Sequence, residues 1–190
     1  MPLPKEKKTK EPMSAWERYK ALPEMTMAEF IDGKIYMMAP PTLRHQRLSG
    51  ELFALIHERI RKKGGPCQVI AAPFSVRLQK SKKNYVEPDI TVVCDKTKLT
   101  DKGCVGAPDW IIEIVSPSDP QHDYIEKLML YKKAGVREYW IVDPKDERVL
   151  VYRMEKDDFR MTAHTFSDKV SVGIFEGFSI NFAAIKKALS

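Results

Sequence analysis

The sequence predicts an α/β (α+β) domain in which helices flank a mixed β-sheet. Helical and strand patterns alternate along the 190 residues, which is typical of helices packed against a central sheet. The segment 109–115 is apolar on both faces, as expected of a strand that is covered from both sides. With 43% hydrophobic and 31% charged residues, the chain is globular rather than fibrous or disordered.

The first third of the chain is expected to hold a helix, a hairpin and a second, longer helix. Ser14 and Glu17 have the spacing of a capping box, so a short helix should begin there and end before Pro23. An Asp-Gly pair at 32–33 lies between apolar residues and predicts a tight hairpin. Apolar residues recur at three- and four-residue spacing over 43–63, and they predict a helix that the following glycines end.

The rest of the chain is expected to hold most of the sheet. Strands are predicted over 69–78, 86–94, 109–115, 138–142 and 149–153. Pro73 lies within the first of them and indicates an edge strand or a bulge. A helix should run over 121–134 and end at a glycine. Shorter strands over 158–180 should then precede a last helix over 182–189.

The charge is moderately positive, with 32 Lys and Arg against 26 Asp and Glu and a net charge of +6. Such a balance suits a polyanionic partner such as nucleic acid, and a solvated basic surface is the alternative. Part of the excess lies in residues 1–12, which are rich in Lys, Glu and Pro and are expected to form a disordered basic lead-in. Residues 13–190 are expected to form a single domain.

The chain is expected to reside in a reducing cytoplasm. No apolar run approaches the roughly 20 residues needed to cross a bilayer, so no membrane partner is expected. Lysines stand where the apolar core of a secretory signal would lie. The three cysteines are an odd number without a CxxC pair, which argues against a disulfide framework and a zinc ribbon.

Two carboxylates on predicted strands are the first candidates for chemistry. Asp89 lies within the strand 86–94, and Glu113 lies between Ile112 and Ile114 in the central strand. Burying an isolated carboxylate is costly unless it is paired, hydrogen-bonded or bound to a metal. Glu113 therefore needs a partner, which either a structural salt bridge or a functional site would supply.

Lys127 and His45 are predicted to point toward the interior. Lys127 falls within the apolar stripe of the helix 121–134, four residues before Tyr131. Its ammonium either reaches water past apolar neighbours or meets Glu113 at the sheet surface. His45 shares the core-facing stripe of the long helix, and it is either a core residue or part of a site.

This set fits metal chemistry better than nucleophilic catalysis. Two carboxylates can hold Mg²⁺ or Mn²⁺ and leave positions for water and a phosphate oxygen. A nearby lysine can stabilise the charge that develops on phosphorus. The sequence has no P-loop, no G-x-G-x-x-G motif and no G-x-S-x-G elbow, which disfavours nucleotide-driven, dinucleotide-dependent and serine-nucleophile enzymes.

Several motifs together resemble a known family. They are Glu87-Pro88-Asp89-Ile90, the run Pro108 to Ser118, the trio Asp123, Lys127 and Tyr131, and the run Gly135 to Pro144. In this order, over about residues 25–180, they resemble the bacterial Uma-two family of restriction endonucleases, a branch of the PD-(D/E)XK nuclease superfamily. The resemblance implies a restriction endonuclease-like fold, a mixed sheet flanked by helices.

The resemblance also implies roles for the candidate residues. Asp89 and Glu113 would be the acidic pair of the superfamily motif, and both would bind Mg²⁺ or Mn²⁺. The superfamily lysine should stand two residues after Glu113, where this chain has Val115. Lys127, on the following helix, would take over that role. Among the catalytic residues, His45 would orient water or a carboxylate.

The resemblance places Glu29 near the same site. It leads to two main hypotheses, with a metal-dependent hydrolase of some other phosphoester as a third. In the first, the protein is a metal-dependent phosphodiesterase, an endonuclease that hydrolyses DNA, with RNA as the other possible substrate. In the second, it is a catalytically inactive nuclease-fold module that binds nucleic acid or another partner, an alternative that Val115 keeps open. Basic segments at 59–63 and 77–83 would hold the phosphate backbone. A homodimer is possible, because superfamily members often act as dimers.

Overall fold

The computed structural model describes residues 12–24, 26–79, 84–116, 122–156 and 158–189. The predicted lead-in, apart from Pro12, lies outside the described residues, as do Lys80, Lys82 and Lys83 of the predicted basic loop. None of the helices in the described ranges has the length and apolar character needed to cross a membrane.

The main sheet is mixed, as the sequence predicts. Its strands follow the order β12 (Phe159–Thr165), β11 (Arg148–Met154), β10 (Glu138–Asp143), β9 (Trp110–Ile114), β6 (Ile90–Val93) and β3 (Gln68–Ala71). Strands β9 and β10 are parallel, whereas the other neighbouring pairs are antiparallel. The parallel pair lies at the centre of the sheet, where both faces are covered, and this explains why 109–115 carries apolar residues on both faces.

A second sheet stands beside the main one and begins with the predicted hairpin. Its order is β2 (Lys34–Met37), β1 (Ala28–Ile31), β5 (Tyr85–Val86), β4 (Val76–Arg77), β8 (Gly103–Val105) and β7 (Leu99–Thr100). The turn residues Asp32 and Gly33 both have positive φ, 45° and 85°, as a tight hairpin turn of this kind requires. A small pair, β13 (Lys169–Ser171) and β14 (Ser179–Asn181), follows later in the chain.

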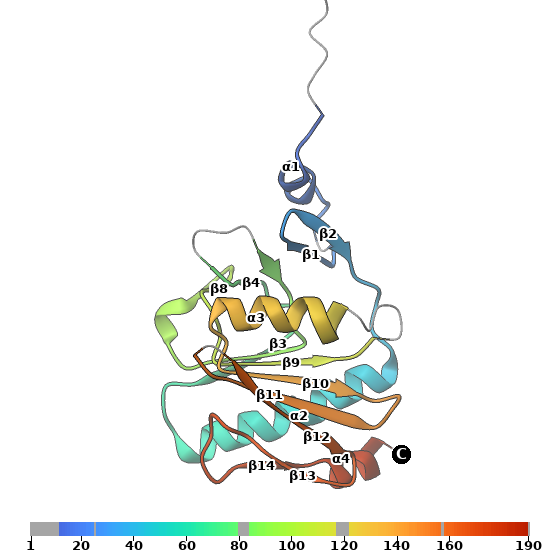
Figure 1. The fold of residues 1–190 in the computed structure, drawn as a ribbon, viewed down its shortest axis with the longest axis vertical. Coiled ribbons are helices and arrows are strands. Elements are labelled where there is room, and N and C mark those ends of the chain that lie inside the picture. Colours follow the sequence, from blue (N-terminus) through green and yellow to red (C-terminus); the bar gives the residue numbers. More distant parts are fainter. Residues whose placement is uncertain (1–11, 25, 80–83, 117–121, 157, 190) are drawn as a thin grey trace, which may run out of the picture.

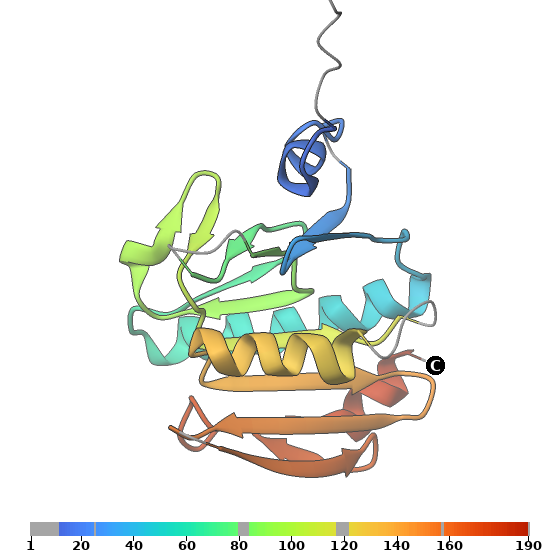
Figure 2. The ribbon, with the colours of Figure 1, turned by 45° about the horizontal axis from the view of Figure 1, so that its top comes forward.

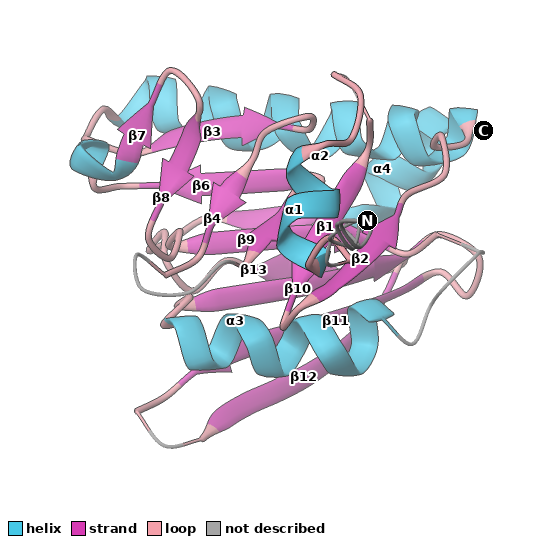
Figure 3. Ribbon diagram, turned by 90° about the horizontal axis from the view of Figure 1, so that it is seen from above, coloured by secondary structure: helices cyan, strands magenta, loops and turns pink. Residues whose placement is uncertain are grey.

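Helices cover the two faces of the main sheet. Figures 1 and 3 show α2 (Leu43–Lys63) and α4 (Phe182–Leu189) on one face and α3 (Leu128–Ala134) on the other. A π-helical segment, His122–Lys127, leads directly into α3. The short helix α1 (Ala15–Lys20) stands on the β1–β2 hairpin, away from the main sheet (Figure 2). Its capping box between Ser14 and Glu17 is present as predicted.

The alternation of side chains along β9 divides the core into two parts. Trp110, Ile112 and Ile114 pack with α2 and α4 on one face of the sheet. Ile111 and Val115 pack on the other face with α3 and the second sheet. Glu113 points to this second face, because alternate residues of a strand share a side. The carboxylate is thus directed at α3.

Two predicted strands are each divided between the two sheets. The segment 69–78 forms β3 in the main sheet and β4 in the second sheet, and 86–94 forms β5 and β6 in the same way. Pro73 and Pro88 stand at the two breaks, where a residue without an N–H cannot continue the ladder. Asp89 therefore lies just before β6 rather than within a strand, which corrects the predicted placement.

The odd number of cysteines argued against a disulfide framework, whereas the structure contains one disulfide. Cys67 and Cys94 form a disulfide, while Cys104 is a buried free thiol. The two bonded residues directly adjoin the antiparallel pair β3–β6, in which Gln68 is opposite Val93. Strand pairing brings them together, whereas their separation of 27 residues carries no such signal in the sequence.

Candidate active site

The two predicted carboxylates come from neighbouring strands of the main sheet. In the antiparallel pairing of β6 with β9, Ile90 is opposite Ile112. One step further along, Asp89 and Glu113 face each other. The backbone N–H of Ile114 donates a 2.7 Å hydrogen bond to Asp89 Oδ2, so β9 itself fixes the aspartate beside the glutamate.

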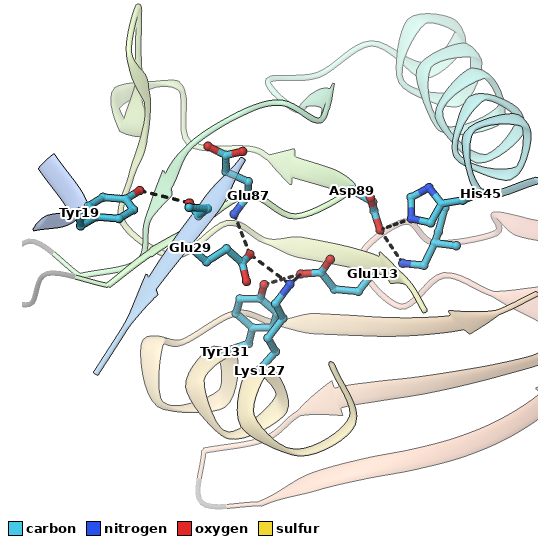
Figure 4. Close-up of polar contacts among 10 residues, drawn as sticks. Tyr19, Glu29, His45, Glu87, Asp89, Glu113, Lys127 and Tyr131 are labelled. Atoms are coloured by element: carbon cyan, nitrogen blue, oxygen red, sulfur yellow. Dashed lines mark hydrogen bonds and ion pairs between the residues drawn. The ribbon is translucent and has the colours of Figure 1, made fainter. Parts of the chain in front are cut away.

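Lys127 reaches Glu113 from the helix that covers this face. Its Nζ lies 3.0 Å from Glu113 Oε1 and 3.1 Å from Glu29 Oε1 (Figure 4). Glu29, Glu113 and Lys127 are 1%, 3% and 4% exposed. Of the two alternatives for Lys127, the structure shows the contact with Glu113 and not a side chain extended into water. Lys127 is the last residue of the π-helical segment, a kind of distortion that is frequent at functional sites.

Glu29 enters the site from β1 of the second sheet. Its Oε1 also accepts a hydrogen bond of 3.0 Å from the backbone N–H of Glu87. The residue stands in a fully buried strand, between Ala28 and Phe30, where a carboxylate needs donors such as the lysine and this N–H. Glu29 therefore ties the hairpin to the sheet face that carries Glu113.

Tyr131 donates a short hydrogen bond to the central carboxylate of the cluster. Its hydroxyl lies 2.6 Å from Glu113 Oε1, one helical turn beyond Lys127 on α3. Burial, followed by the negative charges of Glu113 and Glu29, raises the pKa of Tyr131 well above its usual value of 10.0. The phenol is therefore neutral at physiological pH and acts as a donor to the carboxylate.

His45 contacts the aspartate from the first turn of α2. Its Nε2 lies 3.2 Å from Asp89 Oδ2, and Figure 4 shows the ring pointing at the carboxylate. The side chains of His45 and Asp89 are 12% and 19% exposed, more than those of Lys127 and Glu113. The site is thus open to solvent on its His45–Asp89 side and closed beneath α3.

A further carboxylate, Glu87, stands at the edge of this cluster. Burial and the nearby charge of Glu29 raise the pKa of Glu87 above its usual value of 4.5. Burial, Glu87 and Glu29 likewise raise the pKa of Tyr19, whose hydroxyl is 3.4 Å from the carbonyl oxygen of Ala28. The site and its surroundings are therefore rich in negative charge.

The donor set was tested against the divalent cation that the superfamily resemblance implies. Among the described residues, no group of three or more His, Cys, Asp or Glu is arranged to hold a metal. Mg²⁺ is usually held by one or two carboxylates together with waters and substrate phosphate, and Asp89 with Glu113 matches that open arrangement. Within the described ranges, no hydrogen bond reaches Asp89 Oδ1. In the buried cluster, the ammonium of Lys127 already compensates the charge of Glu29 and Glu113, so a divalent cation fits the Asp89 side of the site.

The structure brings together all four residues that sequence reasoning assigned to the site: Asp89, Glu113, Lys127 and His45. Tyr131 was missed as a functional residue, because its ring reads as part of the apolar stripe of the helix. Its spacing of four residues from Lys127 is the signal that would have identified it. Glu29 was placed near the site only by resemblance, since nothing in the pattern of a short hairpin strand marks it.

Comparisons with known proteins identify the family of the chain. The Uma2 family model, described as "Putative restriction endonuclease", matches residues 16–183. The chain belongs to the Uma2 family. Two uncharacterized proteins of Synechocystis sp. are similar to this Uma2 chain. One is 25% identical over 146 residues, covering 76% of this chain and 75% of the relative. The other is 27% identical over 133 residues, covering 68% and 73%.

A solved structure shows that the Uma2 chain has a nuclease-like fold. It is the crystal structure of a "putative nuclease belonging to DUF820" from Anabaena variabilis, at a TM-score of 0.75 and 21% identity. The match covers 94% of this chain and all of that one. The restriction endonuclease-like fold that the sequence predicts is thus confirmed.

Proposed function

We propose that this Uma2 protein is a metal-dependent phosphodiesterase, an endonuclease that hydrolyses DNA. The observation that carries the proposal is the placement of Asp89 and Glu113 on neighbouring strands, with the ammonium of Lys127 3.0 Å from Glu113. Carboxylates, a lysine and an open side toward solvent suit attack by water on a phosphodiester. The family to which the chain belongs supports DNA as the substrate.

Lys127 supplies the positive charge that the sequence lacks two residues after Glu113. Val115 occupies that position and packs in the core, whereas Lys127 arrives from the π-helical segment on the same side of the sheet. Its ammonium stabilises the carboxylates in the resting protein and is available to negative charge on a bound phosphate. This contact supports catalysis over the inactive binding module, which was favoured only by the missing lysine.

Asp89 and Glu113 would hold Mg²⁺ or Mn²⁺, with Asp89 Oδ1 as one ligand. When bound, such an ion supplies Lewis-acid polarisation of phosphate oxygens and a water of lowered pKa. The backbone N–H of Ile114 and the ring of His45 both contact Asp89 Oδ2, so they orient the aspartate. Tyr131, kept neutral by its raised pKa, orients Glu113 from the other side.

Cleavage of supercoiled plasmid tests the proposal. We expect the wild-type protein to nick or linearise the plasmid with Mn²⁺ or Mg²⁺ and to leave it intact in EDTA. Asp89→Asn keeps the size of the side chain but removes its charge and should reduce the rate at least about 100-fold, as loss of a catalytic charge commonly does. Single-stranded DNA and RNA in parallel assays identify the preferred substrate.

Glu51→Gln is the matched control, because Glu51 is an exposed carboxylate of α2 outside the site. This variant should cut at the wild-type rate. Circular dichroism of each variant verifies that the fold is retained. Metal-dependent cutting that persists in Asp89→Asn would refute the site, and a folded wild-type protein that cuts none of the substrates would refute the function.

A further inference from the structure

A cavity of about 720 Å³ lies outside the candidate active site, between the β1–β2 hairpin and α3. Its volume is within the range of about 300–1,000 Å³ that is usual for small-ligand sites. The proposed reaction assigns no role to this cavity.

The cavity combines an apolar floor with a basic rim. Ile31, Leu78 and Leu130 are buried and line it, and Tyr36 adds an aromatic ring. At its edge, the two apolar side chains of Ile125 and Met129 are 62% and 55% exposed. An apolar floor that is partly open to solvent suits a flat ring system, such as a nucleobase.

Four lysines also line this cavity: Lys34, Lys132, Lys133 and Lys156. They face two carboxylates, of which Asp32 already accepts a hydrogen bond from the amide of Asn84. Within the described part of the chain, no carboxylate forms an ion pair with Lys34, Lys133 or Lys156, whereas Lys132 lies over the ring of Phe159. Three such ammonium groups around one cavity are complementary to phosphate.

The cavity shares two walls with the candidate active site. On β1, Glu29 contacts Lys127 and Ile31 lines the cavity, two residues further on the same face. On α3, Leu130 follows Lys127 by three residues and lines the cavity as well. The cavity therefore adjoins the buried Glu29–Lys127 side of the active site, whereas the site opens to solvent beside His45 and Asp89.

We propose that this cavity binds one nucleotide of the nucleic-acid strand, with its base on the apolar floor and its phosphate on the lysines. This inference rests on the proposed function for the identity of the strand. It adds a contact outside the cleavage site that binds a base and its phosphate together. Such a contact favours a strand with unpaired bases, because moving a paired base out of its stack costs free energy.

Binding of a labelled single-stranded oligonucleotide, followed by fluorescence anisotropy in EDTA, tests this contact without any cleavage. Lys34→Gln/Lys133→Gln should weaken binding by about fivefold for each lysine at low salt, because each removes one phosphate contact. The slope of log Kd against log salt should become shallower by about 1 to 2. Met129→Glu, which puts a negative charge at the edge of the cavity, should also weaken binding.

The matched control is Lys96→Gln/Lys102→Gln, which removes the same charge from two exposed lysines that do not line the cavity. It should bind as the wild type does. The proposal is overturned if the cavity variants bind normally, or if the control loses as much affinity as they do. It is also overturned if only a free 5′-mononucleotide binds in a way that depends on these residues.

Failure of this inference and failure of the proposed function have different signatures. Cavity variants that bind DNA normally while the wild type cleaves it would refute the cavity alone. A protein that binds DNA through the cavity but never cleaves it with metal would refute the proposed function alone.

Discussion

Lys127 is the residue on which the buried cluster depends most. Its single ammonium contacts two buried carboxylates, those of Glu29 and Glu113. Removing one member of a buried ion pair leaves an uncompensated charge in a poorly solvated place. Stability and catalysis are therefore tied to the same side chain.

Lys127→Met should lower the free energy of unfolding by about 3–5 kcal/mol, the usual cost of breaking a buried pair. Chemical denaturation measures this loss. Lys133→Met on the same helix is the control, since Lys133 is exposed, and it should change stability by no more than about 0.5 kcal/mol. Adding Glu29→Gln to Lys127→Met should recover part of the loss, because one orphaned charge disappears. Two independent, additive losses would contradict the shared pairing.

Glu87 provides a test of the electrostatics through pH. Its pKa is raised by burial and then by Glu29, so the folded protein holds the proton more tightly than the unfolded chain. Stability from this group is therefore fully present below 4.5 and is lost as pH rises through the folded pKa. At pH 7–8 the ionised carboxylate opposes folding.

Glu87→Gln should therefore raise the melting temperature at pH 8 and have little effect at pH 4. The exposed Glu51→Gln should shift neither value. Melting temperatures of the wild type and the two variants, measured from pH 4 to pH 8, test this prediction. A Glu87→Gln variant that is less stable than the wild type at pH 8 would contradict this prediction, because it would mean that the ionised carboxylate stabilises the folded protein.

Individual site residues were predictable when local pattern and chemistry agreed. Glu113 was found because a carboxylate in a strand apolar on both faces requires a partner, and Lys127 because it falls in an apolar helical stripe. Tyr131 carried no such signal, because a tyrosine in that apolar stripe is expected to lie in the core. Glu29 of the second sheet pairs with Lys127 of the π-helical segment, and no local pattern indicates a contact with a residue 98 positions away.

At the scale of elements, the sequence predicted what local chemistry determines. The helix over 43–63, the hairpin turn and the last helix have the predicted bounds, because capping residues and apolar spacing specify them. The strands divided at Pro73 and Pro88 were predicted as continuous, because the partner sheet of each half depends on tertiary pairing. Strand propensity does not indicate which of two sheets a strand joins.

The helix predicted over 121–134 shows the same limit of prediction from sequence, here in an element of the candidate active site. An uninterrupted helix was predicted over 121–134, whereas the structure has a π-helical segment that ends at Lys127. A wider helical turn changes the direction of the residues that follow it. The π-helical segment thus bears on how Lys127 meets Glu113, and helical periodicity alone gives no sign of it.

In the whole molecule, the site lies where three layers meet. The main sheet provides Asp89 and Glu113, the helical segment at α3 provides Lys127 and Tyr131, and the second sheet brings Glu29. Buried cores on both faces of the main sheet hold these elements rigidly. Such a support keeps charged groups at fixed separations, which catalysis by preorganised charge requires.

Three expectations for the whole molecule stay predictions: the single domain, the cytoplasmic location and the homodimer. Asp89 and Glu113 should bind one divalent ion between them, and the other carboxylates near the site should not substitute for them.

Calorimetric titration of Mn²⁺ into the folded wild type and into Asp89→Asn/Glu113→Gln tests this claim most directly. We predict one binding event in the wild type that disappears in the double variant, while Glu51→Gln binds as the wild type does. Equal binding by the wild type and the double variant would contradict the account, as would no binding to the wild type.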